Sequence, residues 1–408
     1  MKILQINVVY KDKSTGRTCS EVEKALIQEG HQCITAYGYG KHPNEKNAYR
    51  IDTKFEYAFH NIASRITGWE GYFSYFATRR LIRFIERYNP DVVHLRNIHG
   101  HYLNLPLLFR YLAQKQYPVI QNLHDCWAFT GKCAYYTTIG CYKWKTECGD
   151  CPKIREYPQS LVFDHTKKMK EDKEKWYGAL DNLYVVGVSD WTKREAEQSF
   201  FRKNAKSIQR IYNWINQSVF KPYGEMDCET RAKYEIPQDK YMIIGVSANW
   251  NPGTPRYEDF MKIAQMLRED EVLVLVGKAE KQFEEKAIKH IQFVSDTSEL
   301  ARLYSCADVY VHCSIEDTFG KVVAEALACG IPAVVYNITG CAEIVDNESG
   351  VRVDPRSVEG IRAAIDKLKM QSKAFYKNSC VERVESEFNY EKNVHQLIEL
   401  YQKVVGCK

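Results

Sequence analysis

Short apolar runs alternate with longer amphipathic segments along most of the chain. In the segments Thr18–Glu29 and Tyr72–Tyr88 the apolar residues recur at helical spacing. Six runs in the first half predict strands: Ile3–Val9, Gln32–Tyr37, Asp91–Leu95, Val119–Leu123, Leu183–Val188 and Ile208–Tyr212. Strands that alternate with helices predict right-handed βαβ units and a parallel sheet.

A polar stretch at residues 213–239, which contains Pro222 and Pro237, breaks this rhythm and predicts an interdomain connection. The alternation then resumes, with strands expected at Met242–Ser247, Val272–Gly277, Ile291–Val294, Val309–His312 and Pro332–Tyr336, and helices at Glu258–Leu267, Ser298–Cys306 and Lys321–Cys329. Beyond Tyr336 the pattern is helical to the end. We therefore expect an α/β protein with two doubly wound domains, residues 1–212 and 213–385.

In doubly wound sheets, ligands bind beyond the carboxyl ends of the strands. Two such domains that face each other would form a central cleft. The candidate chemistry is therefore sought in the loops that follow the strands.

The composition excludes several other classes of protein. With 45% hydrophobic and 27% charged residues, the 408-residue chain has globular proportions, which excludes a disordered or coiled-coil protein. No apolar run approaches the roughly 18 residues of a membrane span, and the N-terminus has the pattern of a first strand and not of a signal peptide. A net charge of +5 is too small for a nucleic-acid binder but suits an anionic ligand or membrane surface. We expect a cytoplasmic protein, or one bound peripherally to the inner face of the cytoplasmic membrane.

The most informative stretch is HCSIEDTFGKVVAEALACG at residues 312–330, where a strand, an acidic loop and a helix follow one another. The free N–H groups of a helix N-terminus favour phosphate, Gly320 permits the close approach of a ligand, and Lys321 adds positive charge. Glu325 could accept hydrogen bonds from a ribose, and Asp317 could reach a bound sugar. The alternative is a strand–loop–helix unit with an acidic cap and no ligand.

This segment resembles the retaining nucleotide-sugar glycosyltransferases of the GT-B fold, in the large bacterial group called family 4 or group 1. That family carries two acidic residues separated by seven others and an EA-x-A-x-G-x-P run, matched by Asp317, Glu325 and EALACGIP. Relatives usually have Glu at the first position, so Glu316 competes with Asp317 for that role. The segments Leu303–Asp308 and Ile211–Pro222 are also similar to the family, and the resemblance covers most of the chain.

The resemblance implies roles for further residues. Donor-binding residues would be Gly16, in the loop after the first strand, together with Glu316, Phe319, Gly320, Lys321, Glu325, Gly340 and Glu343. His124 would lie near the donor sugar, and Asp317 would orient the sugar hydroxyls. The positive charge that the family presents to the diphosphate would come from Arg256, Lys278 or Lys321, which remain alternatives. A final helix, residues 386–408, is expected to pack back on the first domain.

The activity that this resemblance implies is the transfer of a sugar, with retention, from a nucleotide-diphosphate sugar. UDP is the expected nucleotide, and a saccharide or lipid-linked glycan of cell-surface polysaccharide biosynthesis is the expected acceptor. No metal or other cofactor is expected for catalysis. The alternatives are a nucleotide-sugar epimerase or hydrolase of the same fold, and a non-catalytic nucleotide-sugar-binding protein.

The acceptor side is expected near the loop HLRNIHGHY, which contributes Asn97 and His99, and near Asn104. A solvated loop is the alternative. The basic helix near Tyr72–Tyr88 and the run His165–Lys175 could contact an anionic bilayer, although a solvated helix face would have the same pattern.

A Cys-rich loop at residues 126–152 follows His124. Its cysteines are spaced C-x7-C-x6-C-x2-C, at Cys133, Cys141, Cys148 and Cys151. Four thiolates can hold a structural Zn²⁺ in tetrahedral geometry. Free thiols, or a redox or disulfide arrangement, are the alternatives.

Overall fold

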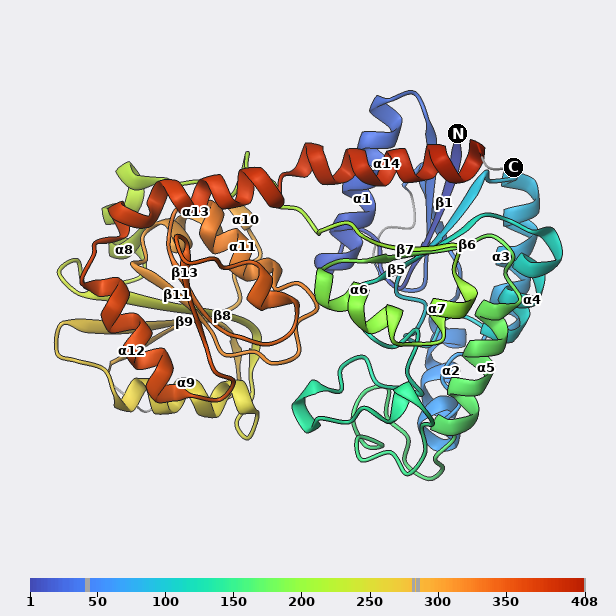
Figure 1. Cartoon of the computed structure of the whole chain (residues 1–408), viewed down its shortest axis with the longest axis horizontal. Helices are drawn as coiled ribbons and strands as arrows, with labels where there is room; N and C mark the ends of the chain where they lie inside the picture. The colour runs from blue at the N-terminus through green and yellow to red at the C-terminus, as the bar shows by residue number, and fades with distance from the viewer. Residues whose placement is uncertain (41–44, 281–282, 284–286, 407–408) are drawn as a thin grey trace. The chain divides into compact units, whose positions relative to one another are not determined.

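The computed structural model describes residues 1–40, 45–280, 283 and 287–406. The chain forms two compact units, Met1–Ile211 with Val394–Lys408, and Tyr212–Asn393 (Figure 1). Each unit has one parallel sheet with helices on both faces, which confirms the predicted doubly wound α/β architecture. Among the described residues, no helix is both long and apolar enough to cross a membrane.

The first unit is built on a seven-stranded sheet in the order β3-β2-β1-β4-β5-β6-β7. Its strands are β1 (Lys2–Asn7), β2 (Gln32–Tyr37), β3 (Ala48–Arg50), β4 (Val92–Leu95), β5 (Val119–Leu123), β6 (Leu183–Gly187) and β7 (Ser207–Arg210). Its helices are α1 (Lys13–Gln28), α2 (Lys54–Thr67), α3 (Tyr75–Tyr88), α4 (Leu105–Lys115), α5 (Thr166–Gly178), α6 (Asp190–Glu197) and α7 (Phe201–Asn204), with short 3-10 turns η1 (Thr137–Ile139) and η2 (Lys143–Lys145).

The alternation of side chains along β4 shows how this sheet is covered. Val93 and Leu95 belong to the apolar core that also contains buried residues of α3, α4 and α5. His94 points to the opposite face, where its Nδ1 lies 2.6 Å from the Tyr401 hydroxyl of the last helix, α14 (Tyr390–Gly406). The part of α14 from Val394 onward thus belongs to the first unit.

The second unit has a six-stranded sheet in the order β10-β9-β8-β11-β12-β13. Its strands are β8 (Tyr241–Trp250), β9 (Glu271–Ala279), β10 (Ile288–Ile291), β11 (Val309–His312), β12 (Ala333–Tyr336) and β13 (Gly350–Val353). Its helices are α8 (Asp227–Lys233), α9 (Pro255–Gln265), α10 (Thr297–Ser305), α11 (Lys321–Ala328), α12 (Val358–Lys369) and α13 (Lys373–Glu387), with the turns η3 (Gly224–Met226) and η4 (Gly340–Glu343). Helices α9 and α12 cover one face, and α10, α11 and α13 the other (Figure 1).

Several sequence expectations need correction. The stretch after Tyr336 is not helical throughout, because Gly350–Val353 pairs with β12 as strand β13. Helix α1 begins at Lys13, five residues before the expected Thr18. Strand β8 continues to Trp250, because a β-bulge between Val246 and Asn249 lets it stay paired with β9.

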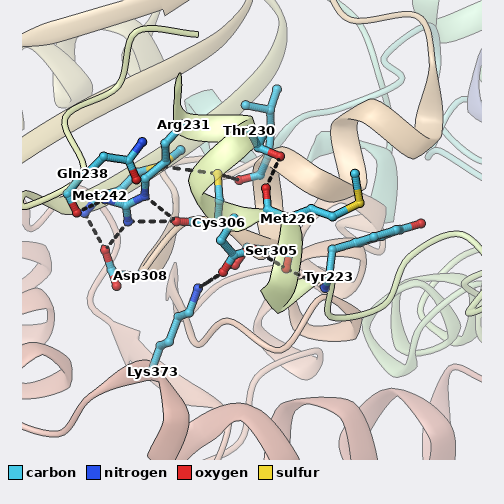
Figure 2. A network of polar contacts seen from close by, with 12 residues as sticks. Tyr223, Met226, Thr230, Arg231, Gln238, Met242, Ser305, Cys306, Asp308 and Lys373 are labelled. Atoms are coloured by element: carbon cyan, nitrogen blue, oxygen red, sulfur yellow. Dashed lines mark hydrogen bonds and ion pairs between the residues drawn. The ribbon is translucent and has the colours of Figure 1, made fainter. Parts of the chain in front are cut away.

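The polar stretch at residues 213–239 is not a free connection but part of the second unit. Figure 2 shows how Arg231 of α8 fixes it: the guanidinium donates to the carbonyl oxygen of Cys306 at 2.8 and 3.1 Å and to Asp308 Oδ2 at 2.9 Å. The same carboxylate oxygen accepts from the backbone N–H of Met242 at 2.7 Å, at the start of β8. Lys373 adds a 2.7 Å hydrogen bond to the carbonyl of Ser305. Buried charge thus replaces an apolar core in this corner.

We predict that Arg231→Met destabilises the second unit by about 3 kcal/mol, because the change removes the charged partner of Asp308 and the guanidinium donor of several carbonyl groups. Arg268→Met is the matched control, since Arg268 forms an exposed ion pair with Asp366 and its loss should cost less than about 1 kcal/mol. Native-state hydrogen exchange of β8 and β11 gives the unfolding free energy of this unit. Equal losses in the two variants would contradict the assignment.

Candidate functional site

The sheet of the second unit changes winding direction between β8 and β11, which are neighbours in the sheet. Asp317, in the loop after β11, is at the centre of the polar groups found there. Its Oδ2 lies 2.7 Å from Nε2 of His312, the last residue of β11, and 3.7 Å from a terminal nitrogen of Arg256. Arg256, in the first turn of α9, also donates to Ser247 Oγ at 2.8 Å. The end of β11 and the first turn of α9 therefore meet at one carboxylate.

The charge state of Asp317 follows from these neighbours. Burial alone would raise the pKa of Asp317, but the charge and hydrogen bond of His312, together with Arg256, hold it well below its ordinary value. His312 is itself oriented by the Tyr310 hydroxyl, 3.1 Å from its Nδ1. Because about a third of the Asp317 side chain is exposed, its carboxylate remains accessible to a ligand.

The loop that carries Asp317 is also fixed through its backbone. The carbonyl of Asp317 accepts from the N–H of Gly340, at the start of η4. Gly320 adopts a left-handed conformation (φ 82°), and a Cβ there would lie 2.7 Å from Cβ of Cys341. In the structure Gly320 thus permits the close approach of η4, while the close approach of a ligand stays a prediction. Helix α11 begins directly after Gly320 and has no side-chain cap at its N-terminus.

The three candidate cations occupy different surroundings. Arg256 contacts Asp317 and Ser247, as described above. Lys278 is exposed at the end of β9, where its ammonium lies 5.8 Å from the centre of the Phe293 ring. Lys321 is half-buried in the first turn of α11. Of the three cations, Arg256 is thus the one that shares the Asp317 carboxylate with His312, at the end of β11.

The other predicted donor residues have mixed surroundings. Glu325 is buried within α11, at 4% exposure, and Glu316 is half-buried beside Asp317 in the loop. Glu343 accepts from the Tyr212 hydroxyl at 3.3 Å. The Phe319 side chain is packed against Tyr212 and Phe388. Phe319 is therefore 2% exposed, and the expectation that this residue binds the donor stays a prediction.

In the first unit, the corresponding change of winding direction falls between β1 and β4. Arg96, which follows β4, is 2% exposed and donates to Gln5 Oε1 of β1 at 2.9 Å. A second guanidinium nitrogen lies 3.1 Å from Nε2 of His124, after β5. Since a guanidinium can only donate, Nε2 of His124 accepts this hydrogen bond. His124 therefore lies at the predicted strand edge, but its Nε2 is not available as a base.

Asp125 connects the remaining acceptor-side candidates. Its Oδ2 accepts from the Asn97 amide at 2.7 Å and lies 2.8 Å from His99 Nε2, while its Oδ1 accepts from the Trp127 N–H at 2.9 Å. The other ring nitrogen of His99 lies 2.9 Å from the Tyr157 hydroxyl. Burial would raise the pKa of Asp125, but the charge of His99 and these hydrogen bonds lower it below its ordinary value.

A small cavity of about 10 Å³ lies among these groups and is lined by Asn97, His99, His124 and Asp125. The structure thus brings together two of the three acceptor-side residues and His124. Asn104 is not among them. It caps α4, accepting from the N–H of Leu107 at 3.1 Å, and is held by helix geometry rather than directed to the cavity.

Gly16 also has a different environment from the one expected. It lies inside α1 and not in the loop after β1. Its carbonyl accepts from the N–H of Lys11 at 3.0 Å, and a Cβ at position 16 would lie 3.1 Å from that nitrogen. The residue is therefore small because the loop folds back on the first turn of the helix.

Three residues of these polar groups were not selected from the sequence: His312 in the second unit, and Arg96 and Asp125 in the first. Each is at the end of a strand or within two residues of it, and Arg96 and Asp125 directly adjoin the selected residues Asn97 and His124. Their position after a buried strand was the available signal. The hydrogen bonds of Arg96 and Asp125 to Gln5 and Asn97 depend on contacts between segments far apart in sequence.

One group of side chains has ligand atoms close enough to share a metal ion among the residues that the structure describes: His60, Glu70 and His101, within 4.8 Å of one another. These atoms already bond to protein. His101 Nδ1 lies 2.5 Å from Glu70 Oε2, and His60 Nδ1 lies 2.7 Å from Ser74 Oγ. Burial lowers the pKa of His60 to about 4, so this ring is neutral. We interpret the group as a structural network beneath α2.

The four cysteines at positions 133, 141, 148 and 151 do not form a group this close, although all four line one cavity.

The chain matches two family models: Glycosyltransferase Family 4 over residues 15–219, and Glycosyl transferases group 1 over residues 229–382. The protein therefore belongs to the family 4, group 1 glycosyltransferases, and the resemblance predicted from residues 312–330 is confirmed. As a member, it is a glycosyltransferase of the GT-B fold.

Individual relatives agree with this assignment. The chain is 24% identical over 377 residues to the putative colanic acid biosynthesis glycosyl transferase WcaC of Escherichia coli K12, covering 88% of each. Among solved structures, sucrose-phosphate synthase from Thermosynechococcus elongatus has a TM-score of 0.68 at 18% identity, with both chains fully covered. HepE from Anabaena, in complex with UDP and glucose, has a TM-score of 0.68 at 13% identity and covers 99% of this chain and 100% of its own. At such identities the solved structures show the shared fold alone.

We predict that Asp125→Asn lowers the unfolding free energy of the first unit by about 2 kcal/mol near neutral pH, because a buried charged acceptor is lost. Because the pKa of Asp125 is lower in the folded protein, this carboxylate is protonated first in the unfolded chain as the pH falls. The stabilisation is therefore present above about pH 5 and is lost below about pH 4. Urea unfolding followed by tryptophan fluorescence measures the difference between wild type and variant.

The control is Asp181→Asn, since Asp181 is exposed and accepts from Gln116 at the surface. A wild-type-minus-variant difference for Asp125→Asn that stays constant down to pH 3.5 would rule out the ionised, paired carboxylate.

Proposed function

We propose that the protein transfers a sugar, with retention of anomeric configuration, from a nucleoside-diphosphate sugar to a saccharide or lipid-linked glycan. UDP is the expected nucleotide, and cell-surface polysaccharide the expected product. The observation that carries the proposal is the arrangement of Arg256, His312 and Asp317 beside the uncapped N-terminus of α11. The relative named as a putative colanic acid biosynthesis glycosyl transferase and a structural neighbour in complex with UDP and glucose support the same chemistry.

The donor phosphates fit the second unit for electrostatic reasons. When the bond between the anomeric carbon and the diphosphate breaks, negative charge grows on the leaving phosphate oxygen. Arg256 and the N–H groups at the start of α11 are fixed before the reaction, and such preorganised donors stabilise developing charge most. Asp317 would hold the sugar hydroxyls, and the buried Glu325 the ribose.

The polar groups also indicate how the acceptor is handled. Both carboxylate oxygens of Asp125 already accept hydrogen bonds, so Asp125 is suited to orient a group rather than to attack the sugar. His124 accepts from Arg96 through Nε2, which removes that nitrogen as a base. We therefore propose that the departing phosphate takes the proton of the acceptor hydroxyl, whose oxygen bonds to the anomeric carbon on the face the phosphate leaves.

The test is incubation with UDP-, GDP-, ADP- and TDP-sugars, with and without lipid or oligosaccharide acceptors. We predict acceptor-dependent nucleotide release and a product with the donor's anomeric configuration, read by NMR. Arg256→Met should lower kcat/KM about 100-fold, since one charge-stabilising group is lost. The matched control is Lys278→Met, which removes an exposed cation and should leave kcat/KM nearly unchanged.

Other outcomes distinguish the alternatives. Nucleotide release or sugar conversion without an acceptor would support a hydrolase or epimerase. Binding without turnover across the panel would support a non-catalytic binding protein and contradict the transferase.

We further propose a cytoplasmic location with peripheral contact to an anionic membrane, through α2. This helix has its apolar residues outside: Phe55, Phe59, Ile62 and Ile66 lie at helical spacing and are 48–82% exposed. The inward face carries buried His60, whose contact with Ser74 was described above. Exposed Lys54 and Arg65 lie on the same helix, which gives the pattern of an interfacial helix on anionic lipid.

The basic surfaces named from sequence contribute less than expected. In the run His165–Lys175, Lys170 and Lys173 point inward and donate to the carbonyls of Thr146 and Trp127. Those two charges are therefore unavailable to a bilayer. On α3, Arg79 and Arg83 are exposed, next to exposed Phe76.

We predict that the wild-type protein floats with vesicles rich in phosphatidylglycerol, and that Phe55→Ser with Phe59→Ser weakens the binding about tenfold per side chain. Phe375→Ser is the control, because Phe375 is also exposed but lies on α13 of the second unit. No flotation of the wild type, or equal flotation of all three proteins, would contradict membrane contact through α2.

A further inference from the structure

The segment between β5 and α5 has little regular structure, with only η1 and η2 among its described residues, yet it is tightly bonded. Lysine side chains link its backbone. Lys132 Nζ donates to the carbonyls of Lys153, Ile154 and Glu156 at 2.7–2.9 Å. Lys143 donates to Gly149 and Asp150 at 2.9 and 3.2 Å. Trp127, Phe129, Tyr136 and Trp144 of this segment join the hydrophobic core, and the lysines fold the rest of it around a separate centre.

The four cysteines lie at that centre. The side chains of Cys133, Cys141, Cys148 and Cys151 are half-buried free thiols and line one cavity of about 20 Å³. Cys133 and Cys151, from opposite ends of the loop, line the same cavity. A cavity of this size has room for about one water molecule or ion. Cysteines separated by up to 17 residues in sequence are therefore gathered around a space that one ion would fill.

The backbone around the cysteines is closely packed. Gly131 lies against Cys148, since a Cβ at position 131 would be 3.0 Å from the Cβ of Cys148. Between the last two cysteines, Gly149 and Asp150 have positive φ values of 142° and 43°, which turn the chain where both side chains line the cavity.

The surrounding charge is an independent observation. Lys132 and Lys153 lie close enough to Cys133 to interact electrostatically with it, and Lys170 and Lys173 do so with Cys148. All four ammonium-bearing side chains are buried, at 1–8% exposure. All four already donate to backbone carbonyls, and Lys153 also pairs with Glu156 at 2.8 Å; nearby negative charge would stabilise such buried ammonium groups further. Four thiolates around one divalent cation carry a net charge of −2, which this environment would neutralise.

We propose that Cys133, Cys141, Cys148 and Cys151 bind one Zn²⁺ in a structural site. Sulfur-only tetrahedral coordination favours zinc over harder cations. On binding Zn²⁺, the four sulfurs would lose their protons and move toward the centre of the cavity that they line. With four protein ligands the ion has no open position for substrate, so it supports the loop that follows Asp125 and Trp127 and takes no part in sugar transfer.

The test is elemental analysis of the full-length protein, purified without chelators or metal-affinity resin. We expect one zinc per chain in the wild type and loss of zinc in Cys148→Ser and Cys151→Ser. Cys228→Ser is the matched control, because Cys228 is an exposed thiol on α8, and this variant should keep its zinc.

X-ray absorption of the wild type needs no variant and remains informative if the serine variants fail to fold. We expect four sulfur ligands at about 2.3 Å. Protein from zinc-supplemented cells that holds no zinc, and takes up none when Zn²⁺ is added under reducing conditions, would overturn the proposal. So would a first shell containing nitrogen or oxygen, or a disulfide among the four cysteines by non-reducing mass spectrometry.

Discussion

A parallel sheet that is wound in both directions from its centre leaves two neighbouring strand ends without a helix crossing between them. In each unit, the candidate polar residues lie where this constraint is met. In the second unit it is met between β8 and β11, where Asp317 joins His312 and Arg256. In the first unit it is met between β1 and β4, where Arg96 joins Gln5 to His124. Charged groups can be buried at these edges because a group of opposite charge, or a hydrogen-bond acceptor, lies close by at the same edge of the sheet.

Rigidity at these edges comes from close backbone contacts as much as from charge. Gly320 allows η4 to lie against the start of α11, and the Gly340 N–H bonds the carbonyl of Asp317. The acid, the helix N-terminus and η4 therefore form one fixed element before any ligand binds. Preorganisation of this kind is what charge stabilisation in a transition state requires, since no free energy is then spent on reorienting donors during the reaction.

The sequence predicted the features that are set locally or by spacing. Strand ends such as His312 followed from apolar runs, and the acid pair followed from the seven residues between Asp317 and Glu325. Features that depend on packing were not predictable. The face of α2 that carries Phe55 has the same spacing as a buried face, and only the tertiary structure places it outside. Similarly, Gly16 has the sequence context of a loop, but the folded-back chain makes it part of a helix.

The central claim is that the second unit holds the donor diphosphate at the N-terminus of α11, next to Arg256 and Asp317. Hydrogen exchange by mass spectrometry, with and without saturating UDP or GDP, tests this most directly. The account predicts slower exchange in peptides covering Thr318–Val323 and Ser247–Arg256, with the rest of the second unit little changed. Nucleotide binding that leaves both peptides unprotected, or that protects only the first unit, would contradict it.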